Sequence, residues 1–151
     1  MQTRRKTLQH SAIVAGLLAA TGLFPGHALA FNAKAFDAKT VSDAIKALGA
    51  AAPTESKDVT IIGPDIAENG AVVPLGASTT LAGVKQLLIL VEKNPSALVA
   101  AFNLTDSVDA NISTRAKMGQ SSDVYAVAVM NDGRTLFAKK EVKVTLGGCG
   151  G

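Results

Sequence analysis

Short segments of strand-like pattern, separated by turn residues, fill the chain from residue 59 to residue 146. Apolar or alternating residues recur in seven segments: 59–62, 71–75, 84–91, 98–104, 110–118, 124–130 and 136–146. Gly-Pro, Asn-Gly, Asn-Pro and Asp-Gly pairs stand between them, and such pairs are typical of tight turns. Many short strands at regular spacing predict an all-β fold, an immunoglobulin-like antiparallel β-sandwich of about seven strands.

A closed barrel is the alternative, because it has the same pattern of short strands. The chain has no tryptophan and a single cysteine, which excludes an antibody-type domain but not the sandwich architecture. The nearly continuous apolar segment 84–91 predicts a central strand, and Pro74 favours an edge position or a bulge. A short helix is expected over 39–48, with one apolar face made of Val41, Ala44, Ile45 and Leu48.

The first 30 residues have the pattern of an export signal. Arg4 and Arg5 precede an apolar run over 12–24, and Ala28-Leu29-Ala30 forms a small-x-small cleavage site. The paired arginines favour the twin-arginine route, although Thr7 departs from its usual pattern, and an ordinary secretory signal stays open. Either route predicts a location outside the cytoplasm, the periplasm in a bacterium. The expected organisation is a signal over 1–30, a β-sandwich over 31–146 and an arm over 147–151.

Removal of the signal leaves 121 residues, the size of one domain, and it takes three of the 15 basic residues. The remaining 12 basic and 12 acidic residues give a nearly neutral protein, and no basic stripe of the nucleic-acid-binding kind is present. Both histidines, His10 and His27, also lie in the signal. A Ser-His-Asp or Cys-His arrangement and a histidine-ligated metal site are therefore excluded from the mature domain.

The carboxylates stand singly at turns and strand ends, and we interpret them as surface groups: Asp65, Glu68, Asp106, Asp109 and Asp132. We therefore expect no catalytic residue, no cofactor and no metal in this chain. We likewise expect no membrane span, since the apolar run of the signal is too short.

The chain ends in a glycine-rich segment around its single cysteine, Gly147-Gly148-Cys149-Gly150-Gly151. Glycine has no side chain to pack and loses the most conformational freedom on ordering, so the segment predicts a flexible arm. Cys149 is the only conspicuous nucleophile of the mature chain, and we predict that it is the site of covalent substrate attachment. Lys139, Lys140 and Lys143 precede it, but we expect a mostly protonated thiol that partner proteins activate.

The chain resembles the SoxY family, the sulfur-carrier subunits of the bacterial thiosulfate-oxidising system. The terminus 142–151 bears the most specific part of the resemblance, with support from 66–70, 111–115 and 130–133. The resemblance implies a carrier and not an enzyme, with Cys149 bearing thiosulfonate and persulfide intermediates.

The same resemblance implies the partners. A c-type cytochrome conjugates thiosulfate to the cysteine, a sulfate thiohydrolase releases sulfate, and a sulfane dehydrogenase acts where present. A second small β-sandwich subunit, SoxZ, forms a heterodimer with the carrier. Whether the sulfur is fully oxidised or deposited, and which face binds SoxZ, stays open.

Three other interpretations of the terminus also stay open. Cys149 could link two copies by a disulfide in a structural or adhesive module, since an unpaired cysteine in an exported protein permits this. A ubiquitin-like glycine thiocarboxylate carrier would need activation in the cytoplasm, which the export signal disfavours. A prenyl anchor requires the cysteine fourth from the end, and Cys149 is third.

Overall fold

The computed structural model describes residues 32–145, and the predicted signal and the predicted arm with Cys149 lie outside this range. Two short helices, α2 (Ala33–Asp37) and α3 (Val41–Ala47), precede the strands. The strands are β1 (Thr54–Glu55), β2 (Val59–Ile62), β3 (Ile66–Ala67), β4 (Val73–Thr79), β5 (Val84–Val91), β6 (Leu98–Asn103), β7 (Asn111–Ala116), β8 (Ser122–Met130) and β9 (Thr135–Val144).

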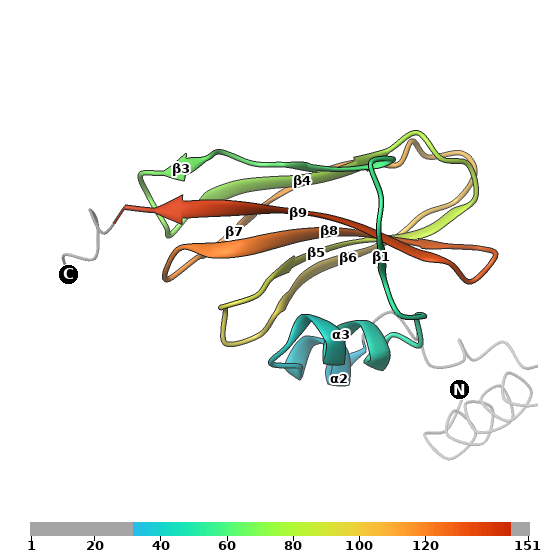
Figure 1. Ribbon diagram of the computed structural model, residues 1–151, viewed down its shortest axis with the longest axis horizontal. Helices are drawn as coiled ribbons and strands as arrows, with labels where there is room; N and C mark the ends of the chain where they lie inside the picture. Colours follow the sequence, from blue (N-terminus) through green and yellow to red (C-terminus); the bar gives the residue numbers. More distant parts are fainter. Residues whose placement is uncertain (1–31, 146–151) are drawn as a thin grey trace, which may run out of the picture. The chain divides into compact units, whose positions relative to one another are not determined.

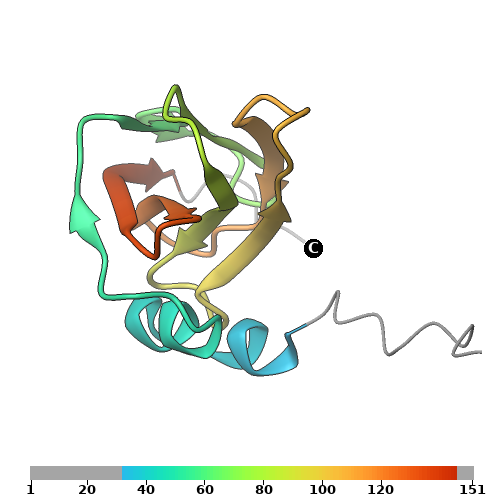
Figure 2. The same cartoon turned by 90° about the vertical axis from the view of Figure 1, so that its right-hand side faces the viewer.

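The strands form two open sheets, which confirms the predicted sandwich. The larger sheet has the order β1-β9-β8-β5-β6, with β3 paired to β9, and the smaller has the order β2-β4-β7. Over the described residues neither sheet closes on itself, so the barrel alternative is wrong. Figure 1 shows the smaller sheet on one face of the larger and the helices on the other. Figure 2 shows the same helix layer end on.

Two apolar clusters hold these layers together. The cluster between the sheets includes Leu75, Leu87, Ile89, Val124 and Val142, each at most 2% exposed. The other lies between the helices and the larger sheet and includes Ala44, Ile45, Leu88, Leu90 and Val127. Strand β5 supplies alternate side chains to both clusters, and it lies between β8 and β6. The prediction of a buried central strand over 84–91 is confirmed.

The predicted helix over 39–48 is observed as α3, and its ends have local causes. Thr40 caps it, because its Oγ1 accepts a hydrogen bond from the backbone N–H of Asp43 at 3.1 Å. Gly49 follows with a φ of 73°, which only glycine adopts readily. Helix α2 was not expected, because five residues are too few to show a helical period.

All seven predicted strand segments overlap observed strands, but β1 and β3 are additional and pair with β9 in parallel. A two-residue strand shows no alternation, so only the edge of β9 determines where these strands form. Pro74 corrects a second expectation, because β4 is the central strand of the smaller sheet. The pairing of β4 with β2 stops at Gly76, however, so Pro74 pairs only with Arg115 on β7. The N–H that proline lacks would point to the β2 side, where β4 has no partner at this position, so no ladder hydrogen bond is lost.

The strongest hairpin signal, Asn131-Asp132-Gly133, joins β8 to β9 as predicted. Gly133 has a φ of 90°, and the N–H of Met130 donates to the carbonyl of Arg134 at 2.8 Å. The turn sets the register in which Ser122 faces Val142. This register directs β9 to the opposite end of the sandwich, where the described residues end (Figure 1).

Candidate functional site at the base of the predicted arm

All predicted site residues, Cys149 and the glycines at 147, 148, 150 and 151, lie outside the described residues. The structure therefore defines the base from which they extend. Thr145 is the last described residue, and Cys149 follows it by four positions. Four residues span at most about 14 Å, so the base fixes the region that the thiol can reach.

Strand β3 holds the end of β9 in place. Ile66 pairs with Lys143 and Ala67 with Val144. The N–H of Lys143 donates to the carbonyl of Asp65 at 3.0 Å, and the N–H of Thr145 donates to the carbonyl of Ala67 at 3.1 Å. These bonds keep the backbone extended up to the last described residue.

A second contact holds the opposite side of β9. The N–H of Val144 donates to Oγ of Ser121 at 2.9 Å. Val142 is fully buried between the sheets, while Val144 is half-buried and packs against the same cluster. The end of β9 is thus fixed from two sides by residues far away in the sequence.

Gly70 completes this arrangement, which we call the β9 clamp (residues 65–70, Met118, Ser121 and 143–145). The N–H of Met118 donates to the carbonyl of Gly70 at 2.7 Å. A Cβ at position 70 would collide with the carbonyl oxygen of Met118 and would lie 2.7 Å from Cγ1 of Val144. The backbone therefore approaches β9 more closely than any other residue would allow.

Sequence reasoning identified the stretch 66–70 as a part of the resemblance and its Asn69-Gly70 pair as a turn, and it assigned the stretch no role at the arm. The structure places this stretch directly at the arm base. The other two supporting stretches lie elsewhere: 111–115 is in β7 and 130–133 forms the β8–β9 turn. Ser121 was missed altogether, because a serine in a loop gives no signal of a partner 23 residues away.

Two of the three lysines on β9 are paired with carboxylates. Nζ of Lys140 lies 2.7 Å from Oδ1 of Asp65 and also donates to the carbonyl of Gly63 at 2.7 Å. The hydrogen bond and the positive charge of Lys140 lower the pKa of Asp65. Nζ of Lys139 lies 3.4 Å from Oδ2 of Asp123. The electrostatic interaction with Tyr125, and then the hydrogen bond to Asp123, raise the pKa of Lys139.

Lys143 differs, since no carboxylate of residues 32–145 lies within ion-pair distance of its Nζ. The positive potential that the sequence places before Cys149 therefore comes mainly from Lys143. Exposed charges act weakly through solvent.

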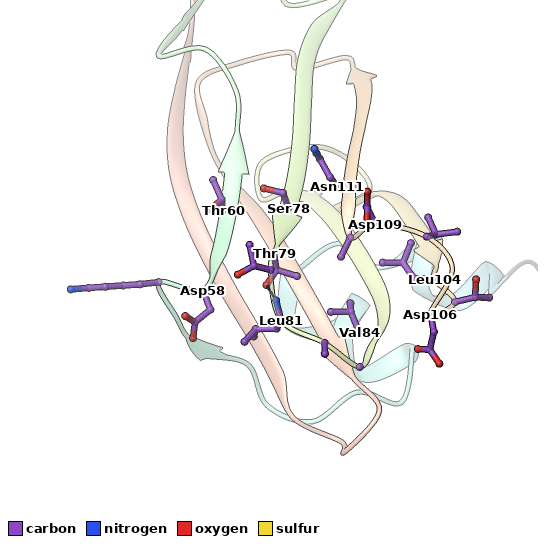
Figure 3. Close-up of a pocket in the computed structure, with 17 residues that line it drawn as sticks. Asp58, Thr60, Ser78, Thr79, Leu81, Val84, Leu104, Asp106, Asp109 and Asn111 are labelled. Atoms are coloured by element: carbon purple, nitrogen blue, oxygen red, sulfur yellow. Dashed lines mark hydrogen bonds between the residues drawn. The ribbon is translucent and has the colours of Figure 1, made fainter.

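A cavity of about 830 Å³ lies far from the arm base. Figure 3 shows Thr60, Ser78, Thr79 and Asn111 in its upper part, Leu81 and Val84 below them, and Leu104 to the right. It opens beside Gly83, whose carbonyl accepts from the N–H of Asn131 at the β8–β9 turn. Strand β9 runs about 30 Å from that turn to Val144, so Cys149 does not reach this cavity.

The predicted surface carboxylates Asp106 and Asp109 line this cavity together with Asp58, and all three are exposed. Residues 32–145 contain no cluster of three or more His, Cys, Asp or Glu side chains arranged to hold a metal ion. Neither described helix has the length and apolar character that a membrane crossing requires.

A smaller hollow of about 390 Å³ lies on the outer face of the smaller sheet, nearer the arm base. Ile62, Pro64, Pro74, Gly76 and Arg115 are among its lining residues. Pro64 directly precedes Asp65, whose carbonyl binds Lys143.

A sandwich that fixes the end of its last described strand, with the single cysteine of the sequence four positions after the last described residue, fits the organisation of a carrier domain. Two comparisons identify which carrier. The family model of the sulfur oxidation protein SoxY matches residues 44–149. The SoxY sulfur carrier from Chlorobium limicola f thiosulfatophilum is 33% identical, with a TM-score of 0.64, over 71% of this chain and 97% of that one.

The chain therefore belongs to the SoxY family, and it is a sulfur carrier protein of sulfur oxidation. The predicted resemblance and the predicted fold class are confirmed. Membership also implies partners from the same system, such as SoxZ.

Other solved structures share the fold alone. A superoxide reductase (neelaredoxin) from Ignicoccus hospitalis is 16% identical, with a TM-score of 0.52, over 58% of this chain and 79% of that one. A putative superoxide reductase from Thermotoga maritima is 9% identical, with a TM-score of 0.54, over 62% of this chain and 94% of that one. No curated protein matches the chain.

Proposed function

We propose that the chain is a covalent carrier in periplasmic thiosulfate oxidation, with its intermediates attached to Cys149. The observation that supports this proposal best is the family match over residues 44–149, which extends to the cysteine itself. The export pattern of residues 1–30 supports the compartment.

The first step of the proposed cycle is an oxidative conjugation. The thiol of Cys149 and the outer sulfur of thiosulfate form an S–S bond, giving a cysteine S-thiosulfonate. The thiol proton is released, and two electrons pass to a c-type cytochrome partner, which is the oxidant.

The second step is a hydrolysis without electron transfer. A sulfate thiohydrolase adds water across the bond between the outer sulfane sulfur and the sulfonate group. Sulfate leaves, and Cys149 keeps a persulfide. A sulfane dehydrogenase, where the organism has one, then oxidises the persulfide further.

The chain's own contribution is to present the cysteine and not to catalyse these steps. The β9 clamp fixes the point from which the arm starts, so every partner meets the arm at the same place on the domain. The glycines on both sides of Cys149 let a narrow segment enter an active site. Ordering them costs about 1–2 kcal/mol per residue, which keeps each visit weak and reversible.

Intact-mass spectrometry of the protein from the periplasm of cells fed thiosulfate tests the proposal. We expect sulfur-containing adducts on the C-terminal peptide and none on the Cys149→Ser variant. An unmodified thiol under these conditions would refute the carrier cycle. A disulfide-linked pair of chains whose function needs no adduct would favour the structural-module alternative.

A further inference from the structure

The edges of the two sheets are protected unequally. A free strand edge presents unpaired N–H and C=O groups, and stable proteins cover such edges or place charges and prolines on them. Strand β9 is covered by β1 and β3 and also carries Lys139, Lys140 and Lys143. The four-residue β2 stands between Lys57-Asp58 and Gly63-Pro64, and β7 carries the exposed Arg115.

Strand β6 has these protections only at its start, where Leu98 is buried beside α2 and the N–H of the preceding Ala97 donates to the carbonyl of Ala38 at 3.0 Å. Figure 1 shows it as the last strand of the larger sheet, beyond β5. Residues 97–104 contain no charge and no proline, and the strand is half-buried over 99–102. Among the described residues no other strand or loop pairs with the outer side of 99–103.

The hydrogen bonds of β5 show which backbone groups of β6 point outward. The N–H of Leu104 donates to the carbonyl of Lys85 at 2.9 Å, so Leu104 faces β5. In an antiparallel ladder, the backbone N–H and C=O groups of successive residues point alternately toward the partner strand and away from it. The two strands pair without a shift from Gln86–Asn103 to Ile89–Ala100. Phe102 and Ala100 therefore also bond to β5, while the backbone groups of Ala101 and Asn103 point away from the sheet.

We infer that β6 is the docking edge for the second β-sandwich subunit, which adds an uncharged extended strand to the larger sheet. This inference rests on the proposed function, which supplies a partner of that class. Strand addition obtains its affinity from main-chain hydrogen bonds, and Ala101 and Asn103 offer a donor and an acceptor each. Because residues 97–104 carry no charge, a charged strand would find no counter-charge there and would lose solvation.

The position of β6 fits a permanent subunit better than an enzyme that acts on the arm. In the sheet order, β6 is three strand spacings from β9, or about 14 Å. A subunit on β6 therefore leaves the β9 clamp and the Cys149 side open to the enzymes. Across the sheet, Ala101 is in register with Phe137, which lies seven positions or about 23 Å before Val144, so an enzyme bound there would be beyond the reach of the arm.

Matched proline variants of the full chain test the inference by calorimetric titration with purified SoxZ of the same organism. Ala101→Pro removes an outward N–H of β6, a position where a sheet tolerates proline. Ser113→Pro makes the same change on β7, because the N–H of Thr79 donates to Ala110 and so turns Ser113 outward. We expect Ala101→Pro to weaken binding at least about tenfold and Ser113→Pro to change it less than about twofold.

Asn103→Lys is the second variant, since it places a charge at the exposed end of β6 without changing the backbone. It should weaken SoxZ binding in the same direction while the melting temperature stays within a few degrees of the parent. Equal affinity for both β6 variants and the parent would overturn the inference.

Hydrogen exchange on the SoxZ complex gives an independent outcome. The amides of Ala101 and Asn103 should become protected, and that of Ser113 should not. Protection confined to the hollow around Pro64 and Pro74 would overturn the docking edge, as would self-association of the chain through β6 without SoxZ. Adduct formation on Cys149 does not depend on β6, so failure of either proposal is seen separately.

Discussion

Gly70 packs closely against Val144 at the end of β9, with no room for a side chain at position 70. A Cβ there would lie 2.7 Å from Cγ1 of Val144. Val144 is the last residue of β9 and stands five positions before Cys149. The close contact links the Ile66–Gly70 stretch to the base of the predicted arm, and several consequences can be measured.

Gly70→Ala should destabilise the domain and loosen the end of β9. The new methyl group meets the backbone of Met118, which cannot move as a flexible side chain would. Overpacking of this kind lowers the free energy of unfolding by about 1–3 kcal/mol. Urea unfolding measures it, with Gly119→Ala as the matched control, since a Cβ at position 119 meets nothing within 4 Å. Equal stability of the two variants would contradict the clamp.

Ser121→Ala should expose the Val144 amide to exchange. The variant removes the Oγ that accepts this N–H at 2.9 Å and leaves a part-buried donor without its partner. The expected loss is about 1 kcal/mol. Hydrogen exchange should accelerate at Val144 in this variant and stay unchanged in Ser113→Ala, whose side chain is exposed on β7. Unchanged protection of Val144 would show that Ser121 is dispensable.

Periodicity in the sequence was enough to predict the elements that form by local pattern. The apolar run 84–91 predicts the central β5, and the spacing of Val41, Ala44, Ile45 and Leu48 predicts α3. The Asn131-Asp132-Gly133 turn predicts the β8–β9 hairpin. Each of these patterns involves only residues that are close together in the sequence, and such local patterns can be recognised in a single sequence.

Local sequence patterns could not predict the β9 clamp. Its contacts join residues up to 78 positions apart, as between Ala67 and Thr145. Strand β3 has two residues and exists only because the edge of β9 offers partners for it. The arm was predicted from composition alone, and Cys149 as the attachment site stays a prediction.

The Asp65–Lys140 pair should appear in the acid titration of the domain. Lys140 lowers the pKa of Asp65, so the pair's contribution to stability is present above the ordinary aspartate value of about 3.9. It is lost as the pH falls through the lowered pKa of the folded state. Lys140→Met should raise the pKa of Asp65 toward its ordinary value, as NMR titration of the carboxyl group measures.

Asp132 is the internal control for that titration. Arg134 lowers its pKa at the far end of β9, so it should titrate alike in the parent and in Lys140→Met. An unshifted Asp65 in the variant would mean that the ion pair does not form in solution. Asp65 is fully exposed, so the accompanying change in stability should be small.

Gly148→Pro should slow the partner enzymes without unfolding the domain. Proline fixes φ near −65° and adds a ring, so the segment before Cys149 loses the freedom to enter an active site. Misplacement of the reacting sulfur should lower the rate of sulfate release by about tenfold or more. Gly148→Ala adds only a methyl group and should lie between Gly148→Pro and the parent. Both variants should unfold at the parent's urea midpoint, because position 148 follows the last described strand, which ends at Val144. Partner rates equal to the parent's in Gly148→Pro would remove the case for a flexible arm, since a rigid segment would then serve as well.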